Sequence, residues 1–388
     1  MDTASAIAFD VIVIGAGPAG SAAATVAARS GLSVALIDKA IFPRDKLCGG
    51  GFTGRAANYY REIFGQDLPA DVPFRSDVEF HAFGENIGVI EDIPPVYMTM
   101  RLELDNLMFE HAIAAGAEDF SGVRDLTIDA DAQRVTFGDG RVLQAAVMIG
   151  ADGIKSAVAR ALFGRSFDAD TVGFGFEIEA PARGEDAPLR IDFGQAIWGY
   201  GWSFPKRNST TIGVGGVLSK NPNLRGIMSD YVEQLGAPPN VRFKGHHLPF
   251  GKARKQPGRA ATLLAGDAAW FVDPVTGEGI AYAMKSGAMA AEAAVEAIQR
   301  HEPHMAVMLY RNRLRPITWA IAQANFVRQI IYWGPFRKGF IRAFRQSGTL
   351  RHDYMRLLGG ELEYHHIMGK LLRRLPNFLR RAFLKPRA

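Results

Sequence analysis

Residues 9–20 read Phe9-Asp-Val-Ile-Val-Ile-Gly-Ala-Gly-Pro-Ala-Gly20, and this stretch decides the fold. An apolar run from Val11 to Ile14 is typical of a buried β-strand and leads directly into Gly15-x-Gly17-x-x-Gly20. The first glycine permits a tight turn, the second lets the backbone approach a pyrophosphate, and the third lets a helix pack closely on the strand. The N-terminus of that helix offers free N–H groups and the positive end of its dipole to phosphates.

The residues that follow complete a dinucleotide-binding unit. A helix of small residues ends at Gly31, and a second apolar run ends at Leu36-Ile-Asp38-Lys39. Asp38 lies eighteen residues after Gly20, where a carboxylate can accept a hydrogen bond from an adenosine ribose hydroxyl. The succession of strand, glycines, helix, strand and acid therefore predicts a Rossmann-like domain.

Distant segments indicate which dinucleotide is bound. A short apolar strand runs from Ala261 into Gly266-Asp267, and Asp273-Pro-Val-Thr-Gly-Glu-Gly-Ile280 opens an Ala-rich helix that extends to about Arg300. Asp267 can accept a hydrogen bond from a ribityl or ribose hydroxyl, and Gly277 and Gly279 let the backbone meet a ring that becomes anionic when reduced. A third segment, Ile149-Gly-Ala-Asp-Gly-Ile-Lys-Ser156, repeats the pattern.

Together these segments resemble the FAD-binding signatures of the p-hydroxybenzoate-hydroxylase-like flavoproteins, so the expected cofactor is FAD. The resemblance implies that Ala19, Lys39 and Ile280 also bind it. Arg101-Leu-Glu-Leu-Asp-Asn-Leu-Met108 resembles the R-x-x-L-D-x-x-L segment of this group, whose arginine contacts FAD, with Met108 in place of the final leucine. Alternatively, Arg101 serves only the N-terminus of a helix. Val123 matches the position whose backbone meets the adenine.

The composition limits where the protein acts. A single cysteine, Cys48, excludes an internal disulfide and agrees with a reducing cytosol. No basic region followed by an apolar stretch opens the sequence, and no apolar run approaches eighteen residues, so we expect neither a secretory signal nor a transmembrane helix. No spacing of histidines and cysteines indicates a metal site. We expect a cytoplasmic protein, peripheral on the inner face of a membrane.

We expect an α/β protein (α+β overall) with three regions. A Rossmann-like FAD-binding domain is assigned to residues 1–75, 98–165 and 256–300. An inserted antiparallel β-sheet substrate domain is assigned to residues 76–97 and 166–255, because stretches such as Gly173–Glu179 and Thr210–Leu218 are β-rich or alternate between faces. Residues 301–388 form a basic, amphipathic, helical C-terminal region.

That C-terminal region is strongly basic. Residues 301–388 hold 17 Lys or Arg and 4 Asp or Glu, a net charge of +13, whereas the rest of the chain carries −8. Aromatic residues alternate with the cations in residues 326–333, 336–345 and 371–384, and helical spacing puts Phe336, Phe340 and Phe344 on one face. This pattern favours an interfacial helix on anionic lipid. The alternative is a helical layer packed on the flavin domain with a solvated basic face. No nucleic-acid recognition module is present, so we expect no nucleic-acid partner.

Two motifs narrow the chemistry. Pro43-x-x-x-x-Cys48-Gly49-Gly50 and Tyr200-x-Trp202-x-Phe204-Pro205 resemble the paired motifs of the geranylgeranyl reductase family of flavoproteins, over roughly residues 8–300. The resemblance implies that Cys48, Gly49 and Gly51 contact the flavin and that Cys48, Tyr200 and Trp202 are catalytic. Cys48 would shape the flavin or relay a proton, and the two aromatics would line an alkene channel. Alternatively, Cys48 is a small buried hydrophobe and the aromatics are sheet core.

If the resemblance holds, the protein saturates a C=C bond of a polyprenyl chain with hydride from N5 of reduced FAD and a proton. The prenylated lipid or pigment is left open. The electron donor is NAD(P)H or a ferredoxin-like carrier, because only one nucleotide fingerprint is present.

Two alternatives remain. A flavin monooxygenase or halogenase shares the cofactor scaffold, although halogenases read W-x-W-x-I-P where this chain has Tyr200 and Phe204. The second alternative is an inactive flavoprotein that only binds polyprenyl lipid.

Overall fold

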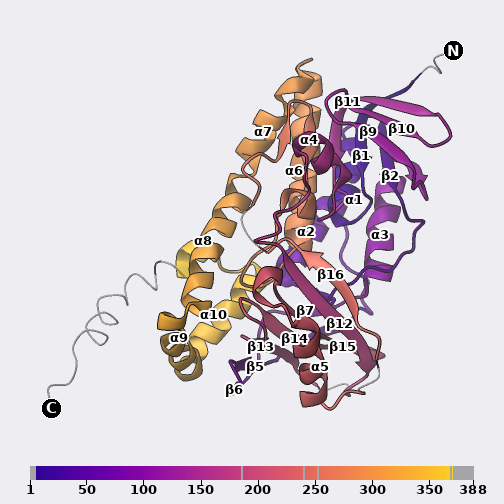
Figure 1. Cartoon of the computed structure of the whole chain (residues 1–388). Helices are drawn as coiled ribbons and strands as arrows, with labels where there is room; N and C mark the ends of the chain where they lie inside the picture. Colours follow the sequence, from indigo (N-terminus) through magenta and orange to yellow (C-terminus); the bar gives the residue numbers. More distant parts are fainter. Residues whose placement is uncertain (1–5, 185–186, 239–240, 251–252, 368, 370–388) are drawn as a thin grey trace, which may run out of the picture.

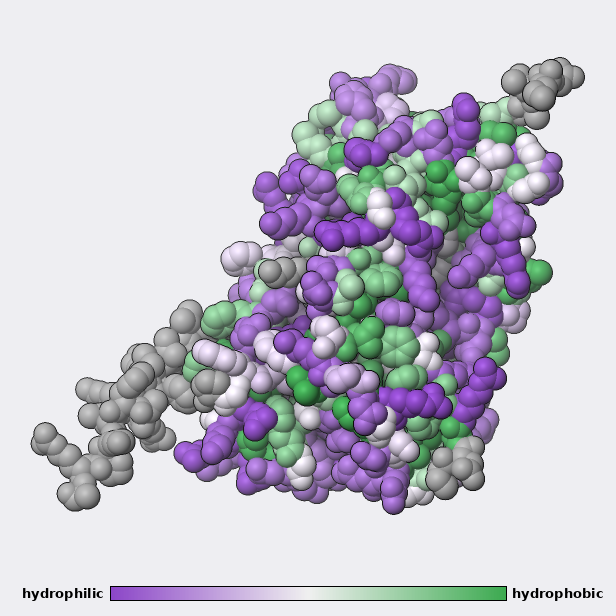
Figure 2. All heavy atoms as spheres, in the orientation of Figure 1, coloured by the Kyte–Doolittle hydropathy of each residue, from purple (hydrophilic) through white to green (hydrophobic). Residues whose placement is uncertain are grey.

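The computed structural model describes residues 6–184, 187–238, 241–250, 253–367 and 369. Two large β-sheets lie at opposite ends of the molecule, and helices of the C-terminal region run along one side from the first sheet to the second (Figure 1). On the face drawn in Figure 2, apolar residues gather near the middle and polar residues cover most of the rest. The mixed α/β architecture expected from the sequence is confirmed.

The first sheet carries the glycine-rich turn. Its parallel strands stand in the order β18, β11, β1, β2, β8, and antiparallel pairing adds β17 to one edge and β10, followed by β9, to β11. The C-terminal half of β1, Val11–Ile14, is buried, because it pairs on both sides and helices cover the sheet. The strands are β1 (Ile7–Ile14), β2 (Val34–Asp38), β8 (Glu118–Ser121), β9 (Leu126–Asp129), β10 (Arg134–Phe137), β11 (Val142–Gly150), β17 (Gly258–Arg259) and β18 (Thr262–Leu264).

Helices α1 (Pro18–Arg29), α3 (Arg101–Ala114), α4 (Ala157–Phe163) and α6 (Ile280–Gln299) surround this sheet. Helices α1 and α6 cross closely, since a Cβ on Gly287 would lie 2.0 Å from the carbonyl oxygen of Ala19. The Ala-rich sequence of both helices is what permits this approach, because small side chains let two helix backbones come together.

The second sheet has the order β16-β12-β15-β14-β13-β5-β6. It is antiparallel as expected, except that β13 and β5 pair in parallel. These two strands are separated by more than a hundred residues that include much of the first sheet, so no hairpin fixes their relative direction. The strands are β5 (Val78–Ala82), β6 (Glu85–Ile90), β12 (Gly173–Pro181), β13 (Leu189–Phe193), β14 (Tyr200–Pro205), β15 (Ser209–Val217) and β16 (Lys244–Leu248).

This segregation of strands supports the division into domains that we propose from the sequence. Helix α5 (Leu224–Gln234) packs on the second sheet, where the Tyr231 hydroxyl donates a hydrogen bond to Asp192 at 2.5 Å. A small third sheet, β3-β7-β4, lies with helix α2 (Gly54–Phe64) between the two large ones. Its strands are β3 (Gly51–Phe52), β4 (Phe74–Arg75) and β7 (Val96–Met98).

The C-terminal region forms helices α7 (Ala306–Arg313), α8 (Arg315–Tyr332), α9 (Gly334–Gln346) and α10 (Gly348–Gly359). Phe344 is 2% exposed, and its ring lies 5.0 Å from that of Phe80 and 5.7 Å from that of Phe193. Phe340 stacks on Phe344 and contacts Phe193. These aromatics therefore pack on the second sheet, so the expectation that Phe340 and Phe344 insert into a bilayer is wrong, because the sheet offers a nearer apolar surface.

No helix among the described residues has the length and hydropathy needed to cross a membrane. The last basic and aromatic stretch, residues 371–384, lies outside the described residues.

Candidate active site

A cavity of about 780 Å³ runs from the glycine-rich turn of β1 to the second sheet and α10. It is lined by nearly all residues that the sequence singles out: Gly15, Gly17, Ala19, Asp38, Lys39, Cys48, Gly49, Gly51, Arg101, Val123, Tyr200, Trp202, Asp267, Gly277, Gly279 and Ile280. Gly20 does not line it. A Cβ on Gly20 would lie 1.6 Å from the carbonyl oxygen of Gly15, so the lack of a side chain at Gly20 lets α1 pack on β1.

The turn at Gly17 leaves room for a phosphate. Gly15 has φ +99°, and a Cβ there would lie 2.4 Å from the Ala151 carbonyl oxygen. A Cβ on Gly17, in contrast, would meet only Arg44, with Nη2 at 3.4 Å. Helix α1 begins after Gly17 without a side-chain cap, so the N–H groups of its first turn are available to an anion in the cavity.

At the far end of β2, Asp38 organises the neighbouring loops. Its carboxylate accepts hydrogen bonds from the N–H groups of Ala16 at 2.8 Å and Ala40 at 2.9 Å, and its backbone carbonyl accepts one from Val123 N–H at 3.1 Å. Carboxylate oxygens have further lone pairs, so Asp38 can still accept a ribose hydroxyl. This end of the cavity fits an adenosine.

Arg101, at the start of α3, is held by a buried ion pair. Its Nε and Nη2 lie 2.5 and 2.7 Å from the two carboxylate oxygens of Asp105, and Arg44 approaches the same carboxylate at 2.8 Å. The two guanidinium groups hold the pKa of Asp105 below its usual value despite burial. Both arginines line the cavity, so this cluster presents net positive charge to it.

The turn before α6 meets the second sheet. Gly277 has φ +73°, and a Cβ there would lie 2.1 Å from the Tyr200 hydroxyl. That hydroxyl donates a hydrogen bond to the Thr276 carbonyl at 3.0 Å, and burial raises the pKa of Tyr200. Helix α6 begins after Gly279 at the cavity, and the Glu278 carboxylate accepts a hydrogen bond from the Ala281 N–H of its first turn at 3.0 Å.

The two motifs that the sequence analysis pairs lie in direct contact. A Cβ on Gly49 would lie 3.0 Å from Nε1 of Trp202 and 3.2 Å from the Phe204 ring, and one on Gly51 would lie 3.3 Å from the same ring. Glycines at these positions thus let residues 49–51 lie flat against the aromatic side chains. Trp202 in turn lies across Gly213 of β15, where a Cβ would be 2.2 Å from its ring.

Several residues that line the cavity were missed by the sequence analysis. Tyr354, Met355 and Leu358 bring α10 into the wall, and Leu189 and Ile191 of β13 face the same space. The C-terminal region was expected either at a membrane surface or as a packed helical layer, and neither expectation included the part of the cavity wall that α10 forms. Nothing in the sequence of α10 marks it, because its place depends on packing between distant elements.

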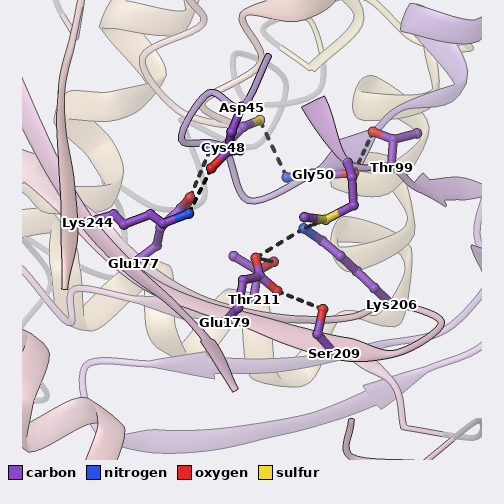
Figure 3. Close-up of polar contacts among 11 residues, drawn as sticks. Asp45, Cys48, Gly50, Thr99, Glu177, Glu179, Lys206, Ser209, Thr211 and Lys244 are labelled. Atoms are coloured by element: carbon purple, nitrogen blue, oxygen red, sulfur yellow. Dashed lines mark hydrogen bonds and ion pairs between the residues drawn. The ribbon is translucent and has the colours of Figure 1, made fainter. Parts of the chain in front are cut away.

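Glu177 of β12 was also missed. Its Oε1 accepts a hydrogen bond from the N–H of Cys48 at 2.9 Å, and the side chain points toward the Cys48 loop (Figure 3). Its Oε2 is buried and has no hydrogen-bond partner among the described residues. Burial raises the pKa of Glu177 to about 7. An acid inside the otherwise apolar run Gly173–Ile178 is the signal that could have drawn attention to it.

The cavity thus offers the N-termini of α1 and α6, a glycine turn with room for phosphates, a cationic cluster, and two carboxylates, Asp38 and Asp267, that can accept hydroxyl hydrogen bonds. This donor set fits FAD, and Cys48 and the second sheet would lie at the flavin end of the site.

Comparisons with known proteins agree with this assignment. Residues 10–84 match the FAD dependent oxidoreductase family. The chain is 36% identical over 313 residues to the menaquinone reductase of Mycobacterium tuberculosis (strain H37Rv), covering 73% of this chain and 76% of that protein. It is 33% identical over 316 residues to the digeranylgeranylglycerophospholipid reductase of Methanosarcina mazei, covering 75% and 76%.

Among solved structures, a geranylgeranyl bacteriochlorophyll reductase-like protein from Thermoplasma acidophilum shares the fold, with a TM-score of 0.79 at 18% identity over 95% of this chain and 100% of that one. The identity to the two reductases exceeds 30% over more than two thirds of the chain, and the paired motifs stand together at one cavity. The chain belongs to the geranylgeranyl reductase family of FAD-dependent oxidoreductases.

Proposed function

We propose that this protein saturates C=C bonds of a polyprenyl chain carried by a lipid. The observation that carries the proposal is the contact of residues 49–51 with the Trp202 and Phe204 rings in the wall of the cavity. Apolar side chains line another part of the same cavity, called the chamber below: Leu189, Ile191, Tyr354, Met355 and Leu358. Menaquinone and digeranylgeranylglycerophospholipid, named in two relatives, differ at the head and share a polyprenyl chain. The chain is therefore the part of the substrate that we assign to the chamber.

Reduced FAD, when bound, supplies hydride to the alkene. The task of the protein is to hold the alkene against the ring in a dry site, because correct orientation of the reacting atoms lowers the barrier. Trp202 offers a flat apolar face 5.7 Å from the ring of Tyr200. The hydrogen bond from Tyr200 to Thr276 fixes that wall to the turn before α6. Leu189, Ile191 and the α10 side chains exclude water from the far end of the chamber.

The source of electrons is part of the proposal. We assign it to NAD(P)H bound transiently or to a ferredoxin-like carrier, because the sequence contains one nucleotide fingerprint and that one serves FAD.

The test is reduction of defined substrates by the full-length protein loaded with FAD. The protein is reduced with dithionite under anaerobic conditions and given menaquinone or a digeranylgeranyl phospholipid in mixed micelles. After the quinone head has been reoxidised in air, mass spectrometry should find the lipid heavier in steps of two hydrogens, because quinol formation would otherwise add the same mass. Oxygenated or halogenated product formed with consumption of O₂ would instead favour a monooxygenase or halogenase. Lipid that binds and is recovered unchanged would favour the alternative of an inactive flavoprotein that only binds polyprenyl lipid.

We also propose that the protein docks on the cytoplasmic face of an anionic membrane. Since Phe340 and Phe344 are packed inside, the aromatic residues available for docking are those of α8 and its C-terminus. Trp319, Phe326 and Trp333 are 67%, 54% and 51% exposed and recur every seven residues, which places them on one side of the helix. Exposed cations flank them on α7, α8 and α9: Arg311, Arg315, Arg337, Lys338 and Arg342. Anionic lipid complements this charge.

A further inference from the structure

Glu177 and Glu179 are a natural pair for comparison, because they lie on the same face of β12, two residues apart. Glu179 is fully engaged: its carboxylate accepts hydrogen bonds from Ser209 at 2.7 Å and Thr211 at 2.5 Å and pairs with Lys206 at 3.4 Å. Figure 3 shows both acids, with Glu179 turned to its three donors and Glu177 turned to the Cys48 loop. Glu179 does not line the cavity, whereas Glu177 does.

The two oxygens of Glu177 differ in their surroundings. Oε1 takes the Cys48 N–H, which leaves Oε2 buried without a partner among the described residues, in a side chain that lines the cavity. The residue is 5% exposed. A carboxylate in this position would leave a charged oxygen unpaired, which is costly. A carboxylic acid fits better, because Oε1 can keep the Cys48 hydrogen bond while Oε2 carries the proton.

The charges around Glu177 act in both directions. Burial, the largest effect, and the nearby Glu179 carboxylate raise its pKa, whereas the Cys48 N–H, Lys206 and Lys244 lower it. Lys244 is largely neutralised, since its Nζ lies 2.8 Å from the Asp45 carboxylate. With a pKa of about 7, Glu177 is protonated in a large part of the molecules at neutral pH.

We propose that Glu177 is the acid that protonates the alkene in the reaction proposed above. The π bond is replaced by two C–H bonds. One carbon receives a hydride, with two electrons, from reduced FAD, and the other receives the proton on Oε2. Glu177 is left as a carboxylate and regains a proton from solvent, and the electron donor of the proposed function reduces the flavin again.

Two other proton-bearing groups in the cavity wall, Tyr200 and Cys48, suit this role less well. The Tyr200 hydroxyl is committed to the Thr276 carbonyl, and burial raises the pKa of Tyr200 far from neutrality. Cys48 holds its loop together through a contact between its Sγ and the Gly50 N–H at 3.4 Å. Its thiol remains a neighbour of the reaction centre, whereas Glu177 supplies the proton.

The experiment compares Glu177→Gln with Glu179→Gln in FAD-loaded, full-length protein. Glutamine keeps an oxygen for the Cys48 N–H but cannot release a proton as a carboxylic acid does. E177Q should bind FAD normally and reduce menaquinone or digeranylgeranyl phospholipid at least about a hundredfold more slowly, the size expected for loss of a general acid. E179Q should stay within a few-fold of wild type.

A second readout does not depend on turnover. Infrared difference spectra between wild type and E177Q, recorded across pH, should isolate one carboxylic acid C=O band that disappears near pH 7. The difference is needed because burial also raises the pKa values of Asp152, Asp273 and Glu278. A band that disappears below pH 5, or equal turnover by E177Q and wild type, would overturn the role of Glu177. Failure of wild-type protein to reduce either lipid would instead overturn the proposed function.

Discussion

The Tyr364 hydroxyl lies 2.7 Å from a carboxylate oxygen of Asp273 and donates a hydrogen bond to it. Asp273 begins the turn that leads through Gly277 to α6, and its other oxygen accepts the N–H groups of Val275 and Thr276. Tyr364 follows α10, so one buried hydrogen bond joins the C-terminal region to a turn that lines the FAD site. Arg55 reinforces this junction through Glu363 at 2.7 Å and the Leu357 carbonyl at 3.0 Å.

Tyr364→Phe should loosen that turn. The variant leaves a buried carboxylate oxygen without its donor, which costs about 1–3 kcal/mol of folding free energy. We expect a lower melting temperature and weaker FAD binding, measured by fluorescence of released flavin on dilution. Tyr59→Phe, on α2 with a partly exposed ring, is the matched control and should change neither. Unaltered flavin affinity in Tyr364→Phe would mean that the turn holds its shape without the C-terminal region.

Gly17→Ala and Gly20→Ala should fail in different ways. A Cβ on Gly17 makes one ordinary contact within the protein, so the variant should fold and lose FAD, because the new methyl group occupies the expected phosphate site. A Cβ on Gly20 would overlap the Gly15 carbonyl, so that variant should fail to fold. Circular dichroism and the flavin-to-protein absorbance ratio separate the two results. Yellow Gly17→Ala protein with full occupancy would contradict the cofactor geometry, and Gly17→Val should be colourless as well.

Cys48→Ala should reduce turnover more than stability. The side chain is small and half-buried, so little packing is lost, and the main chain of its loop stays anchored to Glu177 and to Thr99. We expect FAD to remain bound and alkene reduction to fall at least about tenfold, since small displacements beside a reacting centre are expensive. Cys48→Ser, close in size, tests whether sulfur itself matters. Wild-type turnover in both variants would leave Cys48 a packing residue.

Glu177→Gln should stabilise the protein in a pH-dependent way. Folding raises the pKa of this carboxyl from 4.5 to about 7, so between these pH values the unfolded chain releases a proton that the folded chain keeps. Stability therefore falls as pH rises from about 4.5 to about 7 and then levels off. The shift corresponds to at most about 3 kcal/mol. Glutamine removes this loss, so the melting temperature of E177Q should exceed that of wild type more at pH 8 than at pH 5. A gain independent of pH would contradict the assigned titration.

The exposed side of α8 should control membrane binding. Replacing Trp319, Phe326 and Trp333 together with serine should weaken co-sedimentation with vesicles rich in anionic lipid. Each engaged cation adds on the order of 1 kcal/mol, so binding should also fall in high salt. Phe74→Ser on β4, another exposed aromatic at 54%, is the control and should bind like wild type. Equal binding to neutral and anionic vesicles, or none, would refute the proposed surface.

Residues close together in the sequence were enough to predict the FAD site. They were not enough to predict the wall of the cavity that α10 forms. The turn at Gly15–Gly20 follows from backbone geometry that glycine alone allows, so its function can be derived from a few adjacent residues. The amphipathic pattern of α9 correctly predicts a helix with an aromatic face. It does not say what covers that face, because a sheet and a bilayer are equally apolar partners. Only the position of Phe80 and Phe193 decides between them.

Glu177 shows the same limit. The alternation in Gly173–Glu179 puts residues 177 and 179 on one face, so the sequence cannot tell the two acids apart. Their difference depends on Lys206, Ser209, Thr211 and the Cys48 loop, which come from separate parts of the chain. The parallel pairing of β13 with β5 likewise could not be predicted from the sequence, because a long connection does not fix the relative direction of two strands.

The wall that α10 contributes has a consequence for biosynthesis. Helix α10 follows every described strand in the chain, so a ribosome releases both large sheets before it releases Tyr354, Met355 and Leu358. Until α9 and α10 are released, Phe80 and Phe193 lack the rings of Phe344 and Tyr354 that cover them, and the chamber is open along the side that α10 closes. The nascent protein therefore exposes a hydrophobic aromatic patch through much of its synthesis. A stop codon ahead of α9 would leave that patch permanently uncovered, and the product should be cleared as an aggregation-prone chain rather than persist as a shorter enzyme.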